Sequence, residues 1–76
     1  MIKLGIYKHY KGNMYEVIGI ANHSESLEPM VVYRALYGQN DLWVRPMSMW
    51  DNEITLASGD KVKRFELVEE AKWAIF

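Results

Sequence analysis

The sequence of 76 residues contains no cysteine, so neither disulfide bonds nor a cysteine-ligated zinc site can hold the fold together. No apolar run approaches the roughly 20 residues that a membrane-spanning helix needs, and the N-terminal segment lacks the pattern of a signal peptide. The net charge is only −1, which argues against nucleic-acid binding through a broad basic surface. We therefore expect a cytoplasmic single domain that is stabilised by packing and has no membrane contact.

Aromatic and β-branched residues are abundant instead, and they are arranged as short strands. Half of the residues are apolar, and they include three Trp and five Tyr. Composition predicts strands over 5–11, 14–22, 30–37, 42–46, 53–57 and 61–67. Gly12-Asn13 predicts a two-residue turn that pairs Tyr10 with Tyr15 and His9 with Glu16. The polar stretch 23–29 predicts a loop, where functional side chains are often found.

Helix signals are weak. The Ser48-x-x-Asp51 spacing predicts a single helical turn, because the stretch is too short for a stable helix. Residues 69–76 form either a short amphipathic helix that packs Trp73 and Phe76 or a loosely ordered end, and the helix is favoured. Five to six short strands with tight turns predict an all-β fold, a small barrel or sandwich, over about residues 5–68.

The segment RALYGQNDLWVRP (residues 34–46) raises the question of which sheet face carries its arginines. With an even-length turn, strand alternation places Arg34, Leu36, Trp43 and Arg45 on one face and gives the core Tyr33, Ala35, Tyr37, Leu42 and Val44. If residues 38–41 all lie in the turn, Arg34 faces Arg45, and Glu25, Glu28 or an external anion must compensate. A two-residue turn places Arg34 opposite Trp43 in a cation–π arrangement instead. Arginine beside tryptophan on an exposed strand is also common without any ligand.

Catalytic and metal-binding patterns are sparse. His9, His23 and Glu25 are the main candidates for acid–base or metal chemistry, but no His-Glu-x-x-His motif or phosphate-binding glycine loop accompanies them. Ser24 stands between His23 and Glu25, yet adjacent side chains seldom face one another as a catalytic triad requires. The sequence therefore predicts no metal or cofactor and favours a protein that is not an enzyme.

The segments HYKG, HSE and WVRP, with KRFELV near the end, together resemble a bacterial family of small domains of unknown function. The similarity covers about residues 5–68 and implies an SH3-like β-barrel. It implies that His9 to Gly12 lie in the first hairpin, His23 to Glu25 in the loop, Tyr33 in the central strand, and Trp43, Arg45 and Pro46 in the next strand. Lys63 departs from the pattern, which has proline there. The resemblance brings no activity, cofactor or substrate, and it does not extend to the tail.

The sequence favours a binding or accessory module whose ligand is a peptide, a nucleic acid or a small anion. The candidate binding residues are His9, His23, Glu25, Tyr33, Arg34, Trp43 and Arg45. The aromatic residues would offer stacking surface, the arginines would contact an anion, and the histidines would form pH-sensitive hydrogen bonds; strand alternation also assigns Tyr33 to the core. One alternative is a hydrolase-like enzyme that uses His23, Glu25 and His9. Another is a structural domain that self-associates through an exposed sheet edge.

Overall fold

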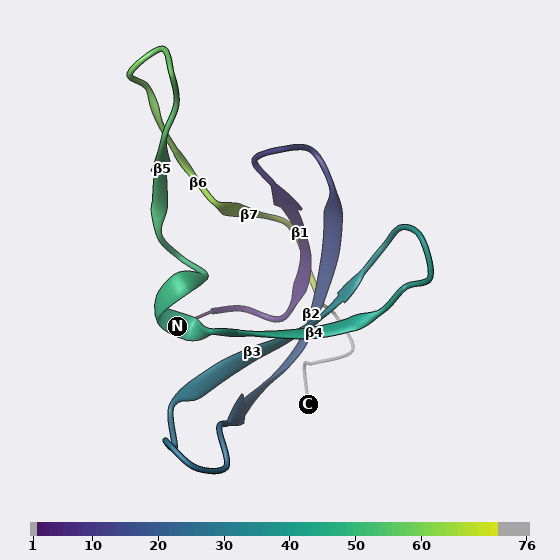
Figure 1. Cartoon of the computed structure of the whole chain (residues 1–76). Coiled ribbons are helices and arrows are strands. Elements are labelled where there is room, and N and C mark those ends of the chain that lie inside the picture. The colour runs from purple at the N-terminus through teal and green to yellow at the C-terminus, as the bar shows by residue number, and fades with distance from the viewer. Residues whose placement is uncertain (1, 72–76) are drawn as a thin grey trace.

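The computed structural model describes residues 2–71, which form seven short strands and one helical turn (Figure 1). The elements are β1 Gly5–His9, β2 Met14–Asn22, β3 Pro29–Ala35, β4 Leu42–Pro46, the 3-10 turn η1 Met47–Met49, β5 Glu53–Thr55, β6 Lys61–Lys63 and β7 Phe65–Glu70. A twisted antiparallel sheet has the order β4-β3-β2-β1-β7, and β5 and β6 form a separate hairpin that extends away from it. The all-β prediction is confirmed. The last expected strand is divided at Arg64, so that β6 pairs with β5 and β7 pairs with β1.

The first hairpin turns more widely than expected. Tyr7 pairs with Tyr15 and Lys8 with Met14, so the predicted pairs Tyr10–Tyr15 and His9–Glu16 are wrong. The reversal is closed by hydrogen bonds from the His9 amide to the Asn13 carbonyl (2.8 Å) and from the Gly12 amide to the His9 carbonyl (2.7 Å). Because the register shifts by an odd number of residues, His9 lies on the same sheet face as Tyr15.

The central hairpin adopts neither of the expected registers. Tyr33 pairs with Trp43, Val31 with Arg45 and Arg34 with Leu42. The Ala35 amide donates to the Asp41 carbonyl at 3.0 Å, so five residues, 36–40, lie in the turn. Two of them, Gly38 and Asn40, have positive φ (60° and 57°), a conformation that glycine and asparagine tolerate best. An odd-length turn pairs residues of the same parity, and it therefore separates Arg34 from Trp43 and Arg45 onto opposite faces.

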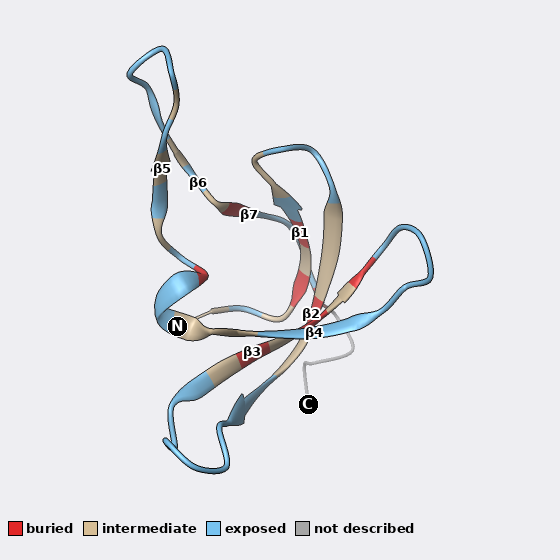
Figure 2. Cartoon of the chain, in the orientation of Figure 1, coloured by how far each residue is buried: buried red, intermediate tan, exposed pale blue. Residues whose placement is uncertain are grey.

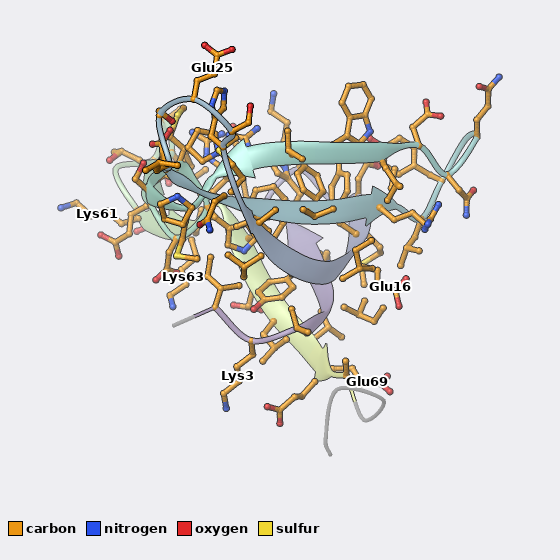
Figure 3. All side chains as sticks on the ribbon, turned by 90° about the horizontal axis from the view of Figure 1, so that it is seen from below. Lys3, Glu16, Glu25, Lys61, Lys63 and Glu69 are labelled. Carbon is orange, nitrogen blue, oxygen red and sulfur yellow. The ribbon has the colours of Figure 1, made fainter. Side chains whose placement is uncertain are left out.

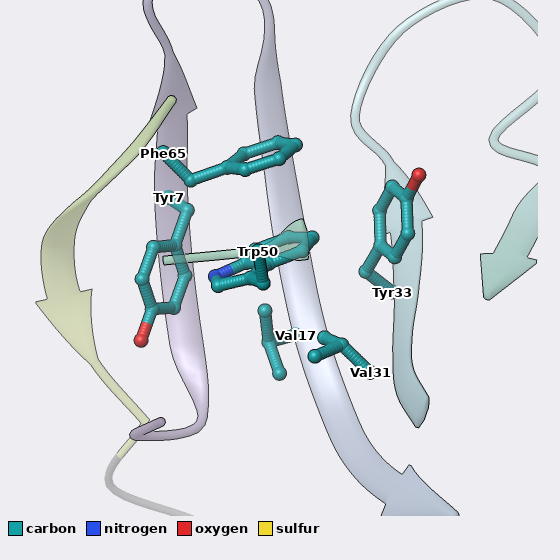
Figure 4. Close-up of a cluster of buried hydrophobic side chains, with 6 residues drawn as sticks. All are labelled: Tyr7, Val17, Val31, Tyr33, Trp50 and Phe65. Carbon is teal, nitrogen blue, oxygen red and sulfur yellow. The ribbon is translucent and has the colours of Figure 1, made fainter. Parts of the chain in front are cut away.

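The core is aromatic and lies on the concave side of the sheet (Figures 2 and 4). Trp50, just after η1, is 1% exposed and stacks on Phe65 with ring centroids 3.7 Å apart. It also meets Tyr7 and Tyr33 edge-on, at 5.4 and 4.9 Å. The indole nitrogen has no hydrogen-bond partner among residues 2–71 and lies on the side of the Tyr7 ring in Figure 4, an arrangement suited to an N–H···π contact.

The predicted core of the central hairpin is only partly correct. Tyr33 and Ala35 are buried as expected. The other three predicted core residues are exposed, with fractions of 46%, 53% and 60% for Tyr37, Leu42 and Val44. Leu42 and Val44 are exposed because the odd-length turn directs the even-numbered residues of β4 away from the concave side. Tyr37 is exposed because it lies within the 36–40 turn itself.

β7 forms the edge of the sheet opposite β4. β7 continues through Glu69 and Glu70, and the Ala71 amide then donates to the Leu4 carbonyl at 2.9 Å. The first residues of the expected helical tail are therefore strand, while Trp73 and Phe76 lie outside the described residues. No helix within residues 2–71 has the length and apolar character needed to cross a membrane.

Candidate functional site

His9 stands at the end of β1, where antiparallel pairing places it beside Phe65 of β7. Its ring lies 4.9 Å from the Phe65 ring and 4.7 Å from the Tyr10 ring, measured between centroids. The Lys11 amide donates to His9 Nδ1 at 3.1 Å. Because Nδ1 accepts this bond, the neutral ring carries its proton on Nε2, which leaves Nε2–H as a donor for a ligand.

Three positively charged side chains lie close enough to affect the charge of this histidine. Burial lowers the pKa of His9 below its ordinary value of 6.5, and the positive charges of Arg64, Lys11 and Arg45 lower it further. We call these four residues the basic cluster. They come from β1, the first turn, β4 and the β6–β7 junction, so only the folded chain brings them together.

The two arginines of the basic cluster are held differently. The Arg64 Nε donates to the side-chain oxygen of Asn52 at 3.0 Å, and backbone bonds join Arg64 to Asn52 and Tyr10. The Arg45 guanidinium lies 5.7 Å from the centre of the Phe65 ring, within cation–π range. The Arg45 Nε is buried and has no hydrogen-bond partner among residues 2–71. The ion pairs among residues 2–71 are Lys3–Glu70 and Lys63–Asp51. Neither Arg45 nor Arg64 is therefore paired with a carboxylate in this range.

Aromatic rings form a wall beside the basic cluster. Tyr15 is its centre, with ring centroids 5.7 Å from Phe65, 5.4 Å from Tyr33 and 5.5 Å from Tyr37. The hydroxyl groups of Tyr15 and Tyr37 are hydrogen-bonded at 2.8 Å. Burial, followed by this hydrogen bond, raises the pKa of Tyr15 to about 12. The Tyr15 hydroxyl therefore stays uncharged at neutral pH, and the wall offers ring surface and hydroxyl groups.

On its other side, His9 borders a hollow of about 450 Å³ between the first turn and the β5–β6 hairpin. Tyr10, Leu56 and Val62 provide apolar lining, and charged side chains surround them: Lys8, Lys61, Lys63, Glu53 and Glu66. The volume lies within the usual range of about 300–1,000 Å³ for small-molecule sites. A ligand held by the basic cluster could thus place a second part of itself here.

Two predicted site residues do not join this group. Arg34 pairs with Glu16 of β2 and with Leu42 of β4, and it lies on the opposite face of the hairpin from Arg45. The prediction that Arg34 and Arg45 share one sheet face is therefore wrong. The Arg34 Nη1 donates to the Asn40 carbonyl at 3.1 Å, which makes this arginine a clamp for the 36–40 turn. Tyr33 is only 8% exposed, so it belongs to the core and offers no stacking surface. Trp43 shares the face of Arg45 and is half exposed.

The loop predicted at residues 23–29 is present over residues 23–28, because Pro29 already belongs to β3. It lies at the other end of β2 from His9 (Figure 1). A nine-residue strand is roughly 30 Å long. His23 Nδ1 accepts the amides of Glu25 (3.2 Å) and Ser26 (3.3 Å), and Glu25 extends into solvent at the loop tip (Figure 3). His9, His23 and Glu25 therefore do not converge as the hydrolase alternative requires. Within residues 2–71, no group of three or more potential ligands could hold a metal ion.

Sequence reasoning missed Arg64, Lys11 and the two aromatic neighbours Tyr15 and Phe65 as members of this site. Arg64 was expected inside a continuous strand, where its position carries no special signal. Its role follows from the break between β6 and β7, which turns the chain toward the first hairpin. Phe65 reaches His9 through the β1–β7 pairing, a contact between residues far apart in sequence.

Comparison with known proteins places the chain in a family. No curated protein matches the sequence. The family model described as "Protein of unknown function (DUF1653)" matches residues 5–67. A crystal structure of a DUF1653 protein from Bordetella bronchiseptica is similar, with a TM-score of 0.82 and 30% sequence identity over 93% of this chain and 92% of that chain. The chain therefore belongs to the DUF1653 family, whose function is unknown.

Proposed function

We propose that this protein is a small cytoplasmic binding module, built on an SH3-like barrel, that recognises an anionic group at the basic cluster. The observation that carries this proposal is that Arg45 and His9 both pack against Phe65, while the Arg64 carbonyl accepts the amide of Tyr10, next to His9. Neither arginine has a carboxylate partner within residues 2–71. Concentrated positive charge of this kind destabilises a small domain, and a bound anion relieves the repulsion.

The available donors suit a carboxylate or a phosphate. An arginine guanidinium presents planar donors that match both groups, and charge-assisted hydrogen bonds are about twice as strong as neutral ones. The Arg45 Nε is already desolvated and has no partner among residues 2–71, so contact with an acceptor removes an existing cost. The His9 Nε2–H would add a further donor, and Tyr15 and Tyr37 would border the apolar part of the ligand.

A free anionic metabolite or the charged end of a peptide fits this arrangement better than a nucleic-acid strand. The whole chain carries a net charge of −1, so a long polyanion would meet repulsion away from the basic cluster. The ligand we propose is therefore small and has one anionic group next to an apolar or aromatic portion. Trp43 is a candidate for further contacts, because it is exposed on the same face as Arg45.

Titration with inorganic phosphate and with acetate, followed by NMR, tests this proposal. We expect saturable shifts of the Arg45 Nε–Hε and His9 ring signals, with a rise in the pKa of His9 because the anion opposes the three positive charges. Arg45→Gln should weaken binding about 10- to 100-fold, as expected for the loss of a charged hydrogen bond. Arg34→Gln is the matched control, since that arginine lies on the opposite face of the same hairpin.

Equal loss of binding in the two variants, or a His9 pKa that does not respond to either anion, would refute an anion site at the basic cluster. Titration with a short single-stranded oligonucleotide tests the alternative that the ligand is a nucleic acid. Binding of the oligonucleotide without binding of either small anion would replace the proposed small ligand by a nucleic acid.

A further inference from the structure

Strand β4 forms an edge of the five-stranded sheet, and within residues 2–71 it pairs only with β3. Its three consecutive residues Leu42, Trp43 and Val44 are 53%, 52% and 60% exposed. An exposed apolar edge strand is a site for pairing with another strand, and proteins usually protect such edges with charge, proline or a covering segment. In β4 such protective residues stand at the two ends of the exposed segment, where Asp41 supplies a charge and Pro46 a proline.

The direction of the backbone groups on this edge follows from the β3–β4 register. The Ala35 amide donates to the Asp41 carbonyl, and hydrogen-bonded pairs alternate along an antiparallel ladder. The backbone of Trp43 and Arg45 therefore points to β3, in the pairs Tyr33–Trp43 and Val31–Arg45. The N–H and C=O groups of Leu42 and Val44 point outward, where no strand within residues 2–71 receives them.

We propose that β4 pairs antiparallel with β4 of a second copy of this chain, around a two-fold axis at Trp43. In this register Leu42 exchanges backbone hydrogen bonds with Val44 of the partner subunit, and Val44 does so with Leu42 of the partner subunit. The outward groups of both strands are then all paired, and two sheets become one continuous sheet. The two Trp43 side chains meet at the axis as a non-hydrogen-bonded pair, in which side chains approach most closely.

The charges along β4 favour a second copy over an unrelated strand. The segment Asp41-Leu42-Trp43-Val44-Arg45 has opposite charges at its two ends and apolar residues between them. Antiparallel pairing about Trp43 puts Asp41 of each copy opposite Arg45 of the other copy. Parallel pairing in register would instead put the two Asp41 residues, and the two Arg45 residues, opposite each other. The segment is thus complementary to itself, as an interface with two-fold symmetry requires.

The side chains next to the edge extend this interface. Val32, Leu42, Trp43 and Val44 line a shallow hollow of about 400 Å³. On the outer face, Val32 and Val44 are cross-strand partners. The corresponding residues of the partner subunit lie across the shared edge, so pairing covers apolar surface on both copies.

Hydrogen exchange at individual amides gives a direct test with the full chain. The amides of Leu42 and Val44 should become protected as the protein concentration rises, because no strand within residues 2–71 binds them and pairing between copies does. The amides of Trp43 and Arg45 are internal controls, since β3 already binds them. Light scattering should show the mass rising from 8.9 kDa to twice that value over the same concentration range.

Two variants make the test specific. Val44→Pro removes an outward N–H without removing a β3–β4 hydrogen bond, and we expect it to weaken dimerisation more than about tenfold. Val44→Thr keeps the amide and the β-branched shape and should keep the dimer. Asp41→Arg should also weaken dimerisation, because it places two arginines opposite each other at both ends of the interface.

Circular dichroism and the melting temperature at low concentration establish that each variant is folded. A monomer at every concentration would overturn the proposal. So would a dimer in which the Leu42 and Val44 amides exchange as fast as in the dilute protein, because that result indicates a different interface. Val44→Pro should still bind phosphate, since Val44 does not belong to the basic cluster. Phosphate binding by this variant therefore tests the anion site separately from the dimer.

Discussion

Gly5, at the start of β1, is the position where one added methyl group probes the pairing of β1 with β7. It has φ = 147°, and a Cβ atom there would lie closer than 3.0 Å to the Glu69 carbonyl oxygen and 2.9 Å from the Ala71 nitrogen. Both are backbone atoms, one in β7 and one in the residue that follows it, so β1 and β7 must move apart. Backbone strain costs roughly 1–2 kcal/mol. The weakened Ala71–Leu4 hydrogen bond and Gly5–Glu70 pairing add about 1 kcal/mol each.

We therefore expect Gly5→Ala to lower the free energy of unfolding by roughly 3–4 kcal/mol, a large part of the roughly 4–11 kcal/mol typical of a domain of this length. Urea denaturation measures the loss, and the melting temperature should fall by more than about 10 °C. Gly12→Ala is the matched control, because Gly12 also has positive φ (109°) but no heavy atom of the described residues 2–71 lies within 4 Å of a Cβ placed there. Equal destabilisation by the two substitutions would refute the steric argument and leave backbone strain as the whole effect.

Two further predictions concern the aromatic residues. Trp50→Ala should lower the free energy of unfolding by about 3–5 kcal/mol, because it removes a side chain that is 1% exposed and stacked on Phe65. Trp43→Ala in dilute protein should lower the free energy of unfolding much less, as urea denaturation measures. Similar losses for the two variants would contradict the assignment of Trp50 to the core. Tyr15 has a pKa raised from 10.0 to about 12, so the folded state favours its neutral form. This contribution to stability is complete below pH 10 and is lost as the pH rises through about 12. Tyr15→Phe should flatten the loss between these values in urea titrations, and an unchanged pH profile would contradict the assignment.

The positions of the strands could be read from the sequence, whereas their registers could not. β-branched and aromatic runs between glycine and asparagine turns indicate strands because these residues pack well on a pleated surface. The length of a turn depends on which residues adopt positive φ, and in the central hairpin Gly38 and Asn40 both do so. That choice makes the turn odd in length and reverses the face of every residue in β4.

The candidate site was predictable only in part, for a related reason. His9 and Arg45 were candidates because of their residue types, and the structure brings both to Phe65. Arg64 reaches them through the bend between β6 and β7, and β1–β7 pairing joins segments more than 50 residues apart in sequence. Local composition contains no signal for such a contact. The loop residues His23 and Glu25 were attractive for their chemistry, but β2 places them at the far end of the sheet.

The pairing of the first strand with the last also determines when this chain can finish folding. β1 to β4 form successive hairpins, each of which needs only neighbouring sequence. Phe65, which covers both Trp50 and His9, is brought in by β7, more than 50 residues after β1 in the sequence. The hairpins of β1 to β4 therefore leave the indole of Trp50 without its stacking partner until β7 has paired with β1. The rate of this last folding step is set by closing one long loop.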